Sequence, residues 1–273
     1  MTREVLLSLG LTTIVGLTMG IGGGLAFFIN EKNKKFFSLS LSFSAGIMIY
    51  AAFMAILPEG MHHLEEYFGD MGKFIGLIGF FGGMIVIALI EKWVHRHGGD
   101  HGHDHGPVDH DHAHEGEEKE GHLSKLGLMS AIAIGIHNLP EGLTIFTTGL
   151  NDISVAIPIA LAVILHNIPL GIAISVPIYY STGSKRKALV YSFLVGLCQP
   201  LGAIIGYLLF ANIETELFIG ILYTVVSGIM IFISLDELLP SSQKDNDHHI
   251  SVYGAIAGMM IMALSLSIFK HSH

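Results

Sequence analysis

The chain has 273 residues, of which 51% are apolar and 14% charged, and its mean hydropathy is +0.60. An ordinary soluble domain carries about 25% charged residues, so this composition excludes that class and indicates a protein that lies almost wholly in a membrane. The formal net charge of −9 comes substantially from one acidic loop, so the charge says little about partners. We expect no nucleic-acid partner.

Eight apolar segments are long enough to cross a bilayer as helices, which takes about 20 residues each. The first is too long for a signal peptide and lacks a small-residue cleavage pattern, so we expect it to remain as a span. The sequence thus predicts an all-α, polytopic membrane protein in which residues 1–273 form a single transmembrane domain. The predicted helices lie near residues 5–29, 37–58, 73–94, 126–149, 153–179, 187–211, 216–239 and 250–270.

The lysines and arginines predict how the chain crosses the bilayer, because these residues concentrate in cytoplasmic loops. With an extracytoplasmic N-terminus, 11 of them lie inside and 3 outside. We therefore expect a multi-pass protein of the cytoplasmic (inner) cell membrane with both termini extracytoplasmic. The 11 inner residues are Lys32, Lys34, Lys35, Lys92, Arg96, Lys119, Lys125, Lys185, Arg186, Lys187 and Lys244.

Two histidines follow the second predicted helix at its outer end. His62 and His63 stand among Glu59, Glu65 and Glu66, and side chains of these types attract cations. A solvated acidic loop explains the pattern equally well. We take His62 and His63 as candidate entrance residues for a cation.

The loop between the third and fourth predicted helices, residues 95–125, is rich in histidine. Nine histidines lie from His95 to His122, mixed with eight acidic residues and without apolar periodicity, so we expect this cytoplasmic loop to be disordered when it holds no metal. Imidazole clusters bind zinc, and buffering or sensing of metal is the functional interpretation; a solvated spacer is the alternative. The candidate loop ligands are His101, His103, His105, His110, His112 and His114.

One six-residue motif occurs twice in the apolar segments, as HNLPEG at residues 137–142 and as HNIPLG at residues 166–171. Ionisable residues at membrane depth indicate a functional site. His137 and Glu141 are one turn apart on a helix and share a face, and His166 offers a third ligand from the antiparallel neighbour. Two imidazoles and a carboxylate suit zinc, and iron or manganese less selectively, and they leave one coordination position open.

A plainer explanation exists for each histidine alone, because histidine and asparagine in membrane helices often only hydrogen-bond to neighbouring helices. It fits the duplicated His-Asn-x-Pro set much less well. Asn138, which adjoins His137, offers a neutral oxygen to the same site.

A second repeat relates the second and seventh predicted helices. Residues 44–50 (SAGIMIY) match residues 226–232 (VSGIMIF), and a Leu-Pro pair follows each at the same offset of 182. The matched helices run in opposite directions, as do the two helices that carry the His-Asn motifs. The sequence therefore predicts an inverted repeat of three, two and three helices, a common build of secondary transporters; chance similarity of apolar helices is the alternative.

These features resemble the ZIP family of divalent metal transporters, most closely its bacterial zinc-uptake branch. The two His-Asn-x-Pro motifs, the Pro-Leu-Gly-Ala of residues 200–203 and the histidine-rich third loop carry the resemblance over nearly the full length. It implies an eight-helix transporter, commonly a homodimer, with a two-metal-capable site between the fourth, fifth and sixth helices and an elevator-like movement. Zinc is the usual substrate, and iron, manganese or cadmium are often accepted.

The chain departs from the family pattern at two positions. Leu170 stands where the fifth-helix motif normally has a glutamate, and Gln199 stands where the sixth helix normally has one. We expect the metal position lined by His137, Glu141 and His166 to persist, and the one lined by Asn138, Asn167 and Gln199 to become weak or empty.

Two carboxylates, Asp236 and Glu237, lie near the inner end of the seventh predicted helix. They are candidates for an exit path, and interfacial carboxylates at a helix end are the simpler alternative.

Three classes of function remain to be compared. The site and the opposed repeats favour a transporter of divalent metal into the cytoplasm, with zinc as substrate and with no cofactor. An intramembrane metalloprotease would need H-E-x-x-H on one helix, which the sequence lacks, so we expect no enzyme. The alternative is a transport-impaired or engineered ZIP-like metal-binding membrane protein, which the loss of two carboxylates makes plausible.

Overall fold

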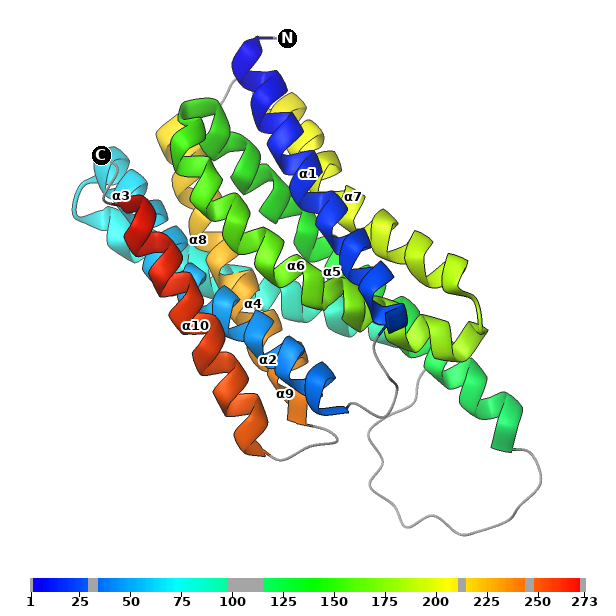
Figure 1. Cartoon of the computed structure of the whole chain (residues 1–273). Coiled ribbons are helices and arrows are strands. Elements are labelled where there is room, and N and C mark those ends of the chain that lie inside the picture. The colour runs from blue at the N-terminus through cyan, green and yellow to red at the C-terminus, as the bar shows by residue number, and fades with distance from the viewer. Residues whose placement is uncertain (1, 29–33, 98–114, 211–214, 244–247, 271–273) are drawn as a thin grey trace.

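The computed structural model describes residues 2–28, 34–97, 115–210, 215–243 and 248–270. All regular elements in these residues are helices packed in one bundle (Figure 1), which confirms the prediction of an all-α protein. In chain order they are α1 (Arg3–Leu25), η1 (Ala26–Phe28), α2 (Lys34–Ala51), η2 (Ala52–Ile56), α3 (Leu57–Phe68), α4 (Met71–His97), α5 (Glu115–Asn151), α6 (Ile153–Thr182), α7 (Lys185–Phe210), α8 (Thr215–Ile233), η3 (Ser234–Leu238), α9 (Leu239–Gln243) and α10 (His248–Lys270).

Seven helical segments within the described residues have the length and hydropathy needed to cross a membrane. They match seven of the eight predicted spans, and one of them joins α2, η2 and α3 into a segment of 34 residues from Lys35 to Phe68. The remaining predicted span corresponds to α5, which packs against α6 and α7. Its polar motif at residues 137–142 makes it less hydrophobic than the other spans.

The histidine-rich loop is shorter at both ends than the sequence suggested. α4 continues to His97 and α5 begins at Glu115. Residues 115–120 (EGEEKE) contain four glutamates and a lysine, which are good helix formers and which composition alone assigned to the loop. The six candidate loop ligands lie outside the described residues, so their disorder and their metal binding stay predictions.

Each of two long helices contains a five-residue π segment directly before a Leu-Pro pair. η2 ends before Leu57 and Pro58, and η3 ends before Leu239 and Pro240. Proline lacks the backbone N–H, and its ring clashes with the carbonyl four residues earlier, so a π turn at this place relieves the helix. η3 begins 182 residues after η2, which is the offset of the sequence repeat.

The contacts between helices also follow the predicted inverted repeat. α2 and α8 run in opposite directions through the bundle (Figure 1). α10 packs along α2 as α4 packs along α8, and α6 packs along α1 as α5 packs along α7. The repeat exchanges α1 with α7, α2 with α8, α4 with α10 and α5 with α6. This exchange turns each of these helix contacts into its counterpart, as an inverted repeat requires.

The helices form two groups. α1, α5, α6 and α7 all contact one another, and we call them the site group; α2, α3, α4, α8 and α10 form the frame group. The main contacts between the groups are those of α2 with α6 and of α5 with α8. The two His-Asn motifs and Gln199 all lie in the site group.

Candidate metal site

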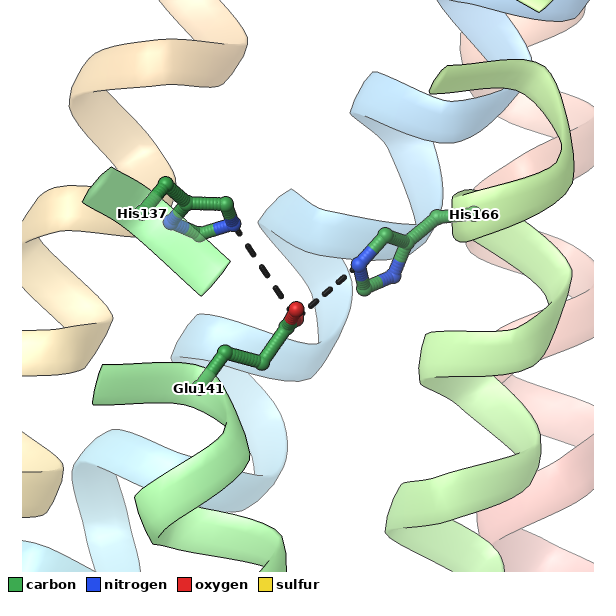
Figure 2. Close-up of side chains that lie close together, drawn as sticks. All are labelled: His137, Glu141 and His166. Atoms are coloured by element: carbon green, nitrogen blue, oxygen red, sulfur yellow. Dashed lines mark ion pairs between the residues drawn. The ribbon is translucent and has the colours of Figure 1, made fainter. Parts of the chain in front are cut away.

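Three ionisable side chains from two helices meet inside the bundle (Figure 2). His137 and Glu141 come from α5 and His166 from α6, and none of the three residues is more than 3% exposed. Glu141 Oε1 lies 2.9 Å from His166 Nε2 and 4.0 Å from His137 Nε2. One ligand atom from each residue therefore falls within a sphere that a single cation can reach, since these atoms are all within 4.8 Å of one another.

The polar atoms of this cluster are poorly satisfied by the protein. Both ring nitrogens of His137 and of His166, and Oε1 of Glu141, have no hydrogen-bond partner among the described residues. The contact of 2.9 Å between Glu141 and His166 is an ion pair if the imidazole is protonated. Buried polar atoms without partners cost free energy, and a metal ion would satisfy three of them at once. Imidazole nitrogen and carboxylate oxygen are ligands that zinc prefers.

The second oxygen of Glu141 has a different role. Its Oε2 accepts a hydrogen bond of 2.7 Å from the Gln199 amide on α7. The Gln199 oxygen in turn accepts one of 3.3 Å from Asn167. A chain of neutral amides therefore orients the carboxylate and leaves its Oε1 facing the two imidazoles, in the manner of outer partners that orient metal ligands.

The two asparagines tie the motifs to neighbouring helices. The Asn138 side-chain amide donates a hydrogen bond of 2.9 Å to the Val195 carbonyl oxygen on α7. The Asn167 side-chain amide donates one of 3.1 Å to the Val15 carbonyl oxygen on α1. Their side-chain oxygens are buried and have no partner among the described residues. Both side chains thus hold the bundle together while their oxygens remain free to contact a cation.

Close helix packing at two equivalent glycines positions these side chains. A Cβ atom on Gly142 would lie 2.1 Å from the Gln199 carbonyl oxygen, and one on Gly171 would lie 2.0 Å from the Met19 carbonyl oxygen. Only glycine permits such an approach. Because the two glycines end the two copies of the motif, α5 meets α7 just as α6 meets α1.

Leu170, where the resemblance leads us to expect a glutamate, is fully buried in the hydrophobic core. Gln199 is fully buried as well, and its nitrogen, which cannot ligate a metal, is the atom that faces Glu141. Among the described residues, Glu141 is thus the acidic member of this buried cluster.

A second cluster lies at one end of the bundle. His63 on α3, Glu66 on α3 and Glu216 on α8 offer ligand atoms within 4.8 Å of one another, and His63 Nδ1 contacts the Glu216 carboxylate. His62 pairs instead with Glu66 at 3.5 Å, and both side chains are more than half exposed. Sequence reasoning missed Glu216, because α3 and α8 come together only in the folded chain.

Two further candidates, Asp236 and Glu237, lie in η3. Asp236 is exposed and Glu237 is partly exposed in η3, and neither belongs to the two clusters above.

Comparison with known proteins agrees with the sequence resemblance. The family described as ZIP Zinc transporter matches residues 5–266. The "Zinc transporter ZupT" of Streptococcus mutans is 46% identical over 270 residues, which cover 98% of this chain and 100% of that protein. The proteins of the same name from Clostridium perfringens, 46% identical over 98% of this chain and 97% of its own length, and from Chlorobium chlorochromatii, 41% identical over 98% of this chain and 100% of its own length, are similar in the same way.

Proposed function

Because this chain belongs to the ZIP zinc transporter family, we propose that it carries divalent metal cations, with zinc as the main substrate, into the cytoplasm. It is a multi-pass membrane protein and a transporter rather than an enzyme. Zinc is accordingly a substrate that passes through the protein, and not a resident cofactor.

The observation that carries the proposal is the buried cluster of His137, Glu141 and His166. Three protein ligands leave a fourth tetrahedral position for water or for exchange, which a carrier needs in order to release its cargo. Zinc lies about 2.0–2.1 Å from imidazole nitrogen, so the two rings need only small movements to close around it. Iron, manganese and cadmium are further candidates, because imidazole and carboxylate discriminate weakly among them.

The arrangement in two groups favours an elevator-like movement. All three candidate ligands and the amides that orient Glu141 belong to the site group. This group therefore has the parts to carry a cation as a unit past the frame group, with α2, α6, α5 and α8 forming the sliding boundary. We propose a homodimer as the family resemblance implies, and measurement of mass in detergent tests it.

The direction of transport rests on the proposed topology. The first residues of α1 and the last of α10 lie at the same end of the bundle, and α5 begins at the other end (Figure 1). The basic residues concentrate at the end where α2, α5 and α7 begin, which is the cytoplasmic side by the positive-inside rule. A membrane-impermeant thiol reagent tests this, because a cysteine at Thr2 should react from outside and one at Ser184 only after permeabilisation.

The cluster of His63, Glu66 and Glu216 supports the proposed entrance. It lies at the end of the bundle opposite to the one where α2, α5 and α7 begin (Figure 1). The His63 ring packs edge-on against Tyr223, and the Tyr223 hydroxyl hydrogen-bonds to Thr148 on α5. We keep Asp236 and Glu237 as the proposed exit and the histidines of residues 98–114 as proposed cytoplasmic buffers, because the sequence places both on the inner side.

Zinc entry into proteoliposomes tests the main proposal, with empty liposomes as background. His137→Ala and Glu141→Ala should each abolish most of the uptake, because each removes one of three ligands. The measurements should use a chain without residues 98–114, so that the loop histidines cannot bind zinc in place of the site. Uptake that survives both substitutions would refute the assignment.

A second candidate function is a membrane metal receptor that binds without transport, which Leu170 and Gln199 favour because two family carboxylates are missing. Equilibrium zinc binding by the same protein distinguishes the two. Binding that depends on His137 together with no uptake would support the receptor.

A further inference from the structure

An apolar groove lies between the two groups of helices, on the side of α6 that faces α2. Its volume is about 340 Å³. Eight of its nine lining residues are apolar, and they belong to α1, η1, α2 and α6. These residues are Leu25, Phe28, Phe36, Ser40, Phe43, Leu165, Ile168, Pro169 and Ile172.

The surroundings of the groove determine what can fill it. The lining residues lie on membrane-spanning segments or at their ends, and Leu25, Phe28 and Phe36 are 44%, 88% and 42% exposed. Water finds too few polar partners in such a place, and an empty gap loses dispersion contacts along its walls. An acyl chain of a membrane lipid has the chemistry to fill it.

Positive charge gathers at the end of the groove where η1 ends and α2 begins. Lys185 Nζ lies 5.6 Å from the centre of the Phe27 ring, which adjoins Phe28. Arg186 and Lys187 follow on the exposed first turn of α7, and Lys35 directly precedes Phe36. Basic residues beside a membrane-spanning helix attract anionic headgroups.

We propose that this groove binds an anionic phospholipid, with one acyl chain between α2 and α6 and the headgroup at Lys35, Lys185, Arg186 and Lys187. The proposed lipid site lies on the boundary between the two groups and next to the second motif. Ile168 and Pro169 of that motif line the groove, and His166 is two residues before Ile168. The bound chain separates α2 from α6 at this end, so the lipid stabilises the arrangement of the two groups seen in the structure.

Tryptophan fluorescence offers a direct test, because the chain contains a single tryptophan, Trp93. In a Trp93→Phe background, Phe36→Trp places a reporter in the groove. The matched control is Phe81→Trp on α4, where the native ring is 56% exposed and lies outside the groove. Both variants are reconstituted in phosphatidylcholine with increasing fractions of phosphatidylglycerol or phosphatidylcholine that carries dibrominated acyl chains, which quench nearby tryptophan.

We expect the groove reporter to reach half-maximal quenching at about a fivefold lower fraction of brominated phosphatidylglycerol than of brominated phosphatidylcholine. The control reporter should respond equally to both lipids. Changing Lys185, Arg186 and Lys187 together to glutamine should abolish the preference at the groove reporter.

Two results would overturn the proposal. Equal quenching of the groove reporter by both lipids would mean that it senses only the general lipid around the protein. Absence of quenching there, while the control reporter is quenched, would mean that protein covers the groove, for example a second copy of the chain. Size-exclusion chromatography of each variant shows whether it is folded before the lipid series begins.

Discussion

Glu141 uses its two oxygens for different purposes. One accepts from Gln199, and the other faces His166 and His137. The neutral Gln199 amide therefore donates a hydrogen bond to Glu141 even when no metal is bound. An ionised carboxylate at position 199 could not lie so close without a metal, because two ionised carboxylates at hydrogen-bond distance repel each other. This arrangement suits a site that binds one cation and must also be stable when empty.

Restoring both missing carboxylates should add a second metal position. In the chain that lacks residues 98–114, we expect Leu170→Glu with Gln199→Glu to raise the zinc stoichiometry from one to two. Binding should tighten about tenfold or more, because each added carboxylate attracts the dication. Isothermal titration calorimetry measures both quantities. The same variant should unfold at a lower temperature without zinc, because a charge replaces the buried Leu170.

Leu170→Gln with unchanged Gln199 is the control, since it changes the size and polarity of the side chain without adding charge. If the double glutamate variant binds no more zinc than this control, the account of the lost position fails.

Much of the candidate site follows from local sequence, and part of it does not. His137 and Glu141 share a helix face through their spacing, and the motif repeat identifies His166 as their counterpart. The hydrogen bond from Gln199 to Glu141 could not be predicted, because the direction of the Gln199 side chain depends on how α7 packs against α5. Glu216 has no local signal at all, since it stands beside His63 only once α8 meets α3.

At the scale of helices, contact between α5 and α7 is what brings Gln199 to Glu141. Gly142→Ala should disturb this contact, because its Cβ would lie 2.1 Å from the Gln199 carbonyl oxygen. We expect a loss of stability of about 1–3 kcal/mol from this overpacking, together with weaker zinc binding. Thermal unfolding in detergent, with and without zinc, measures both effects.

Gly10→Ala on α1 is the matched control, because a Cβ atom there meets nothing within 4 Å. It should change stability by no more than about 0.5 kcal/mol. Equal effects of the two substitutions would show that the close approach at Gly142 does not decide how α5 and α7 pack.

The helices themselves were predicted better than their ends. All eight predicted spans coincide with helices in the described residues, and seven of these helical segments also have the length and hydropathy of a membrane span, because apolar length is a strong signal. The extension of the second span to Phe68 and the start of α5 at Glu115 were missed. Both additions are polar, so hydropathy gave no sign of them, and the π segments became evident only in the backbone.

Across the whole molecule, two buried hydrogen bonds between described residues link the two groups of helices. In one, the Ser44 hydroxyl on α2 donates to the His166 carbonyl oxygen on α6 at 3.3 Å. The other joins the hydroxyl groups of Thr148 on α5 and Tyr223 on α8. A movement of the site group past the frame group must break both. Because a hydrogen bond contributes about 1 kcal/mol net, its loss should change the balance between arrangements about fivefold.

Tyr223→Phe and Thr148→Val should therefore change the rate of zinc uptake in the same direction and by up to about fivefold. Neither substitution should change the equilibrium binding of zinc by His137, Glu141 and His166. In a double-mutant cycle, the double variant should change the rate no more than either single variant. Additive effects would mean that the two hydroxyl groups act separately.

The single carboxylate of the buried site also has an electrical consequence. With neutral imidazoles, Gln199 and Leu170 around it, an ionised Glu141 gives the empty site a charge of −1 and the zinc-loaded site a charge of +1. A membrane potential that is negative inside then pulls the loaded site inward and drives the empty site outward. Each step gains about 2.3 kcal/mol per 100 mV if it crosses the whole field. Zinc uptake by liposomes should accordingly rise when a potassium gradient makes their interior negative, and a rate independent of that potential would contradict this charge balance.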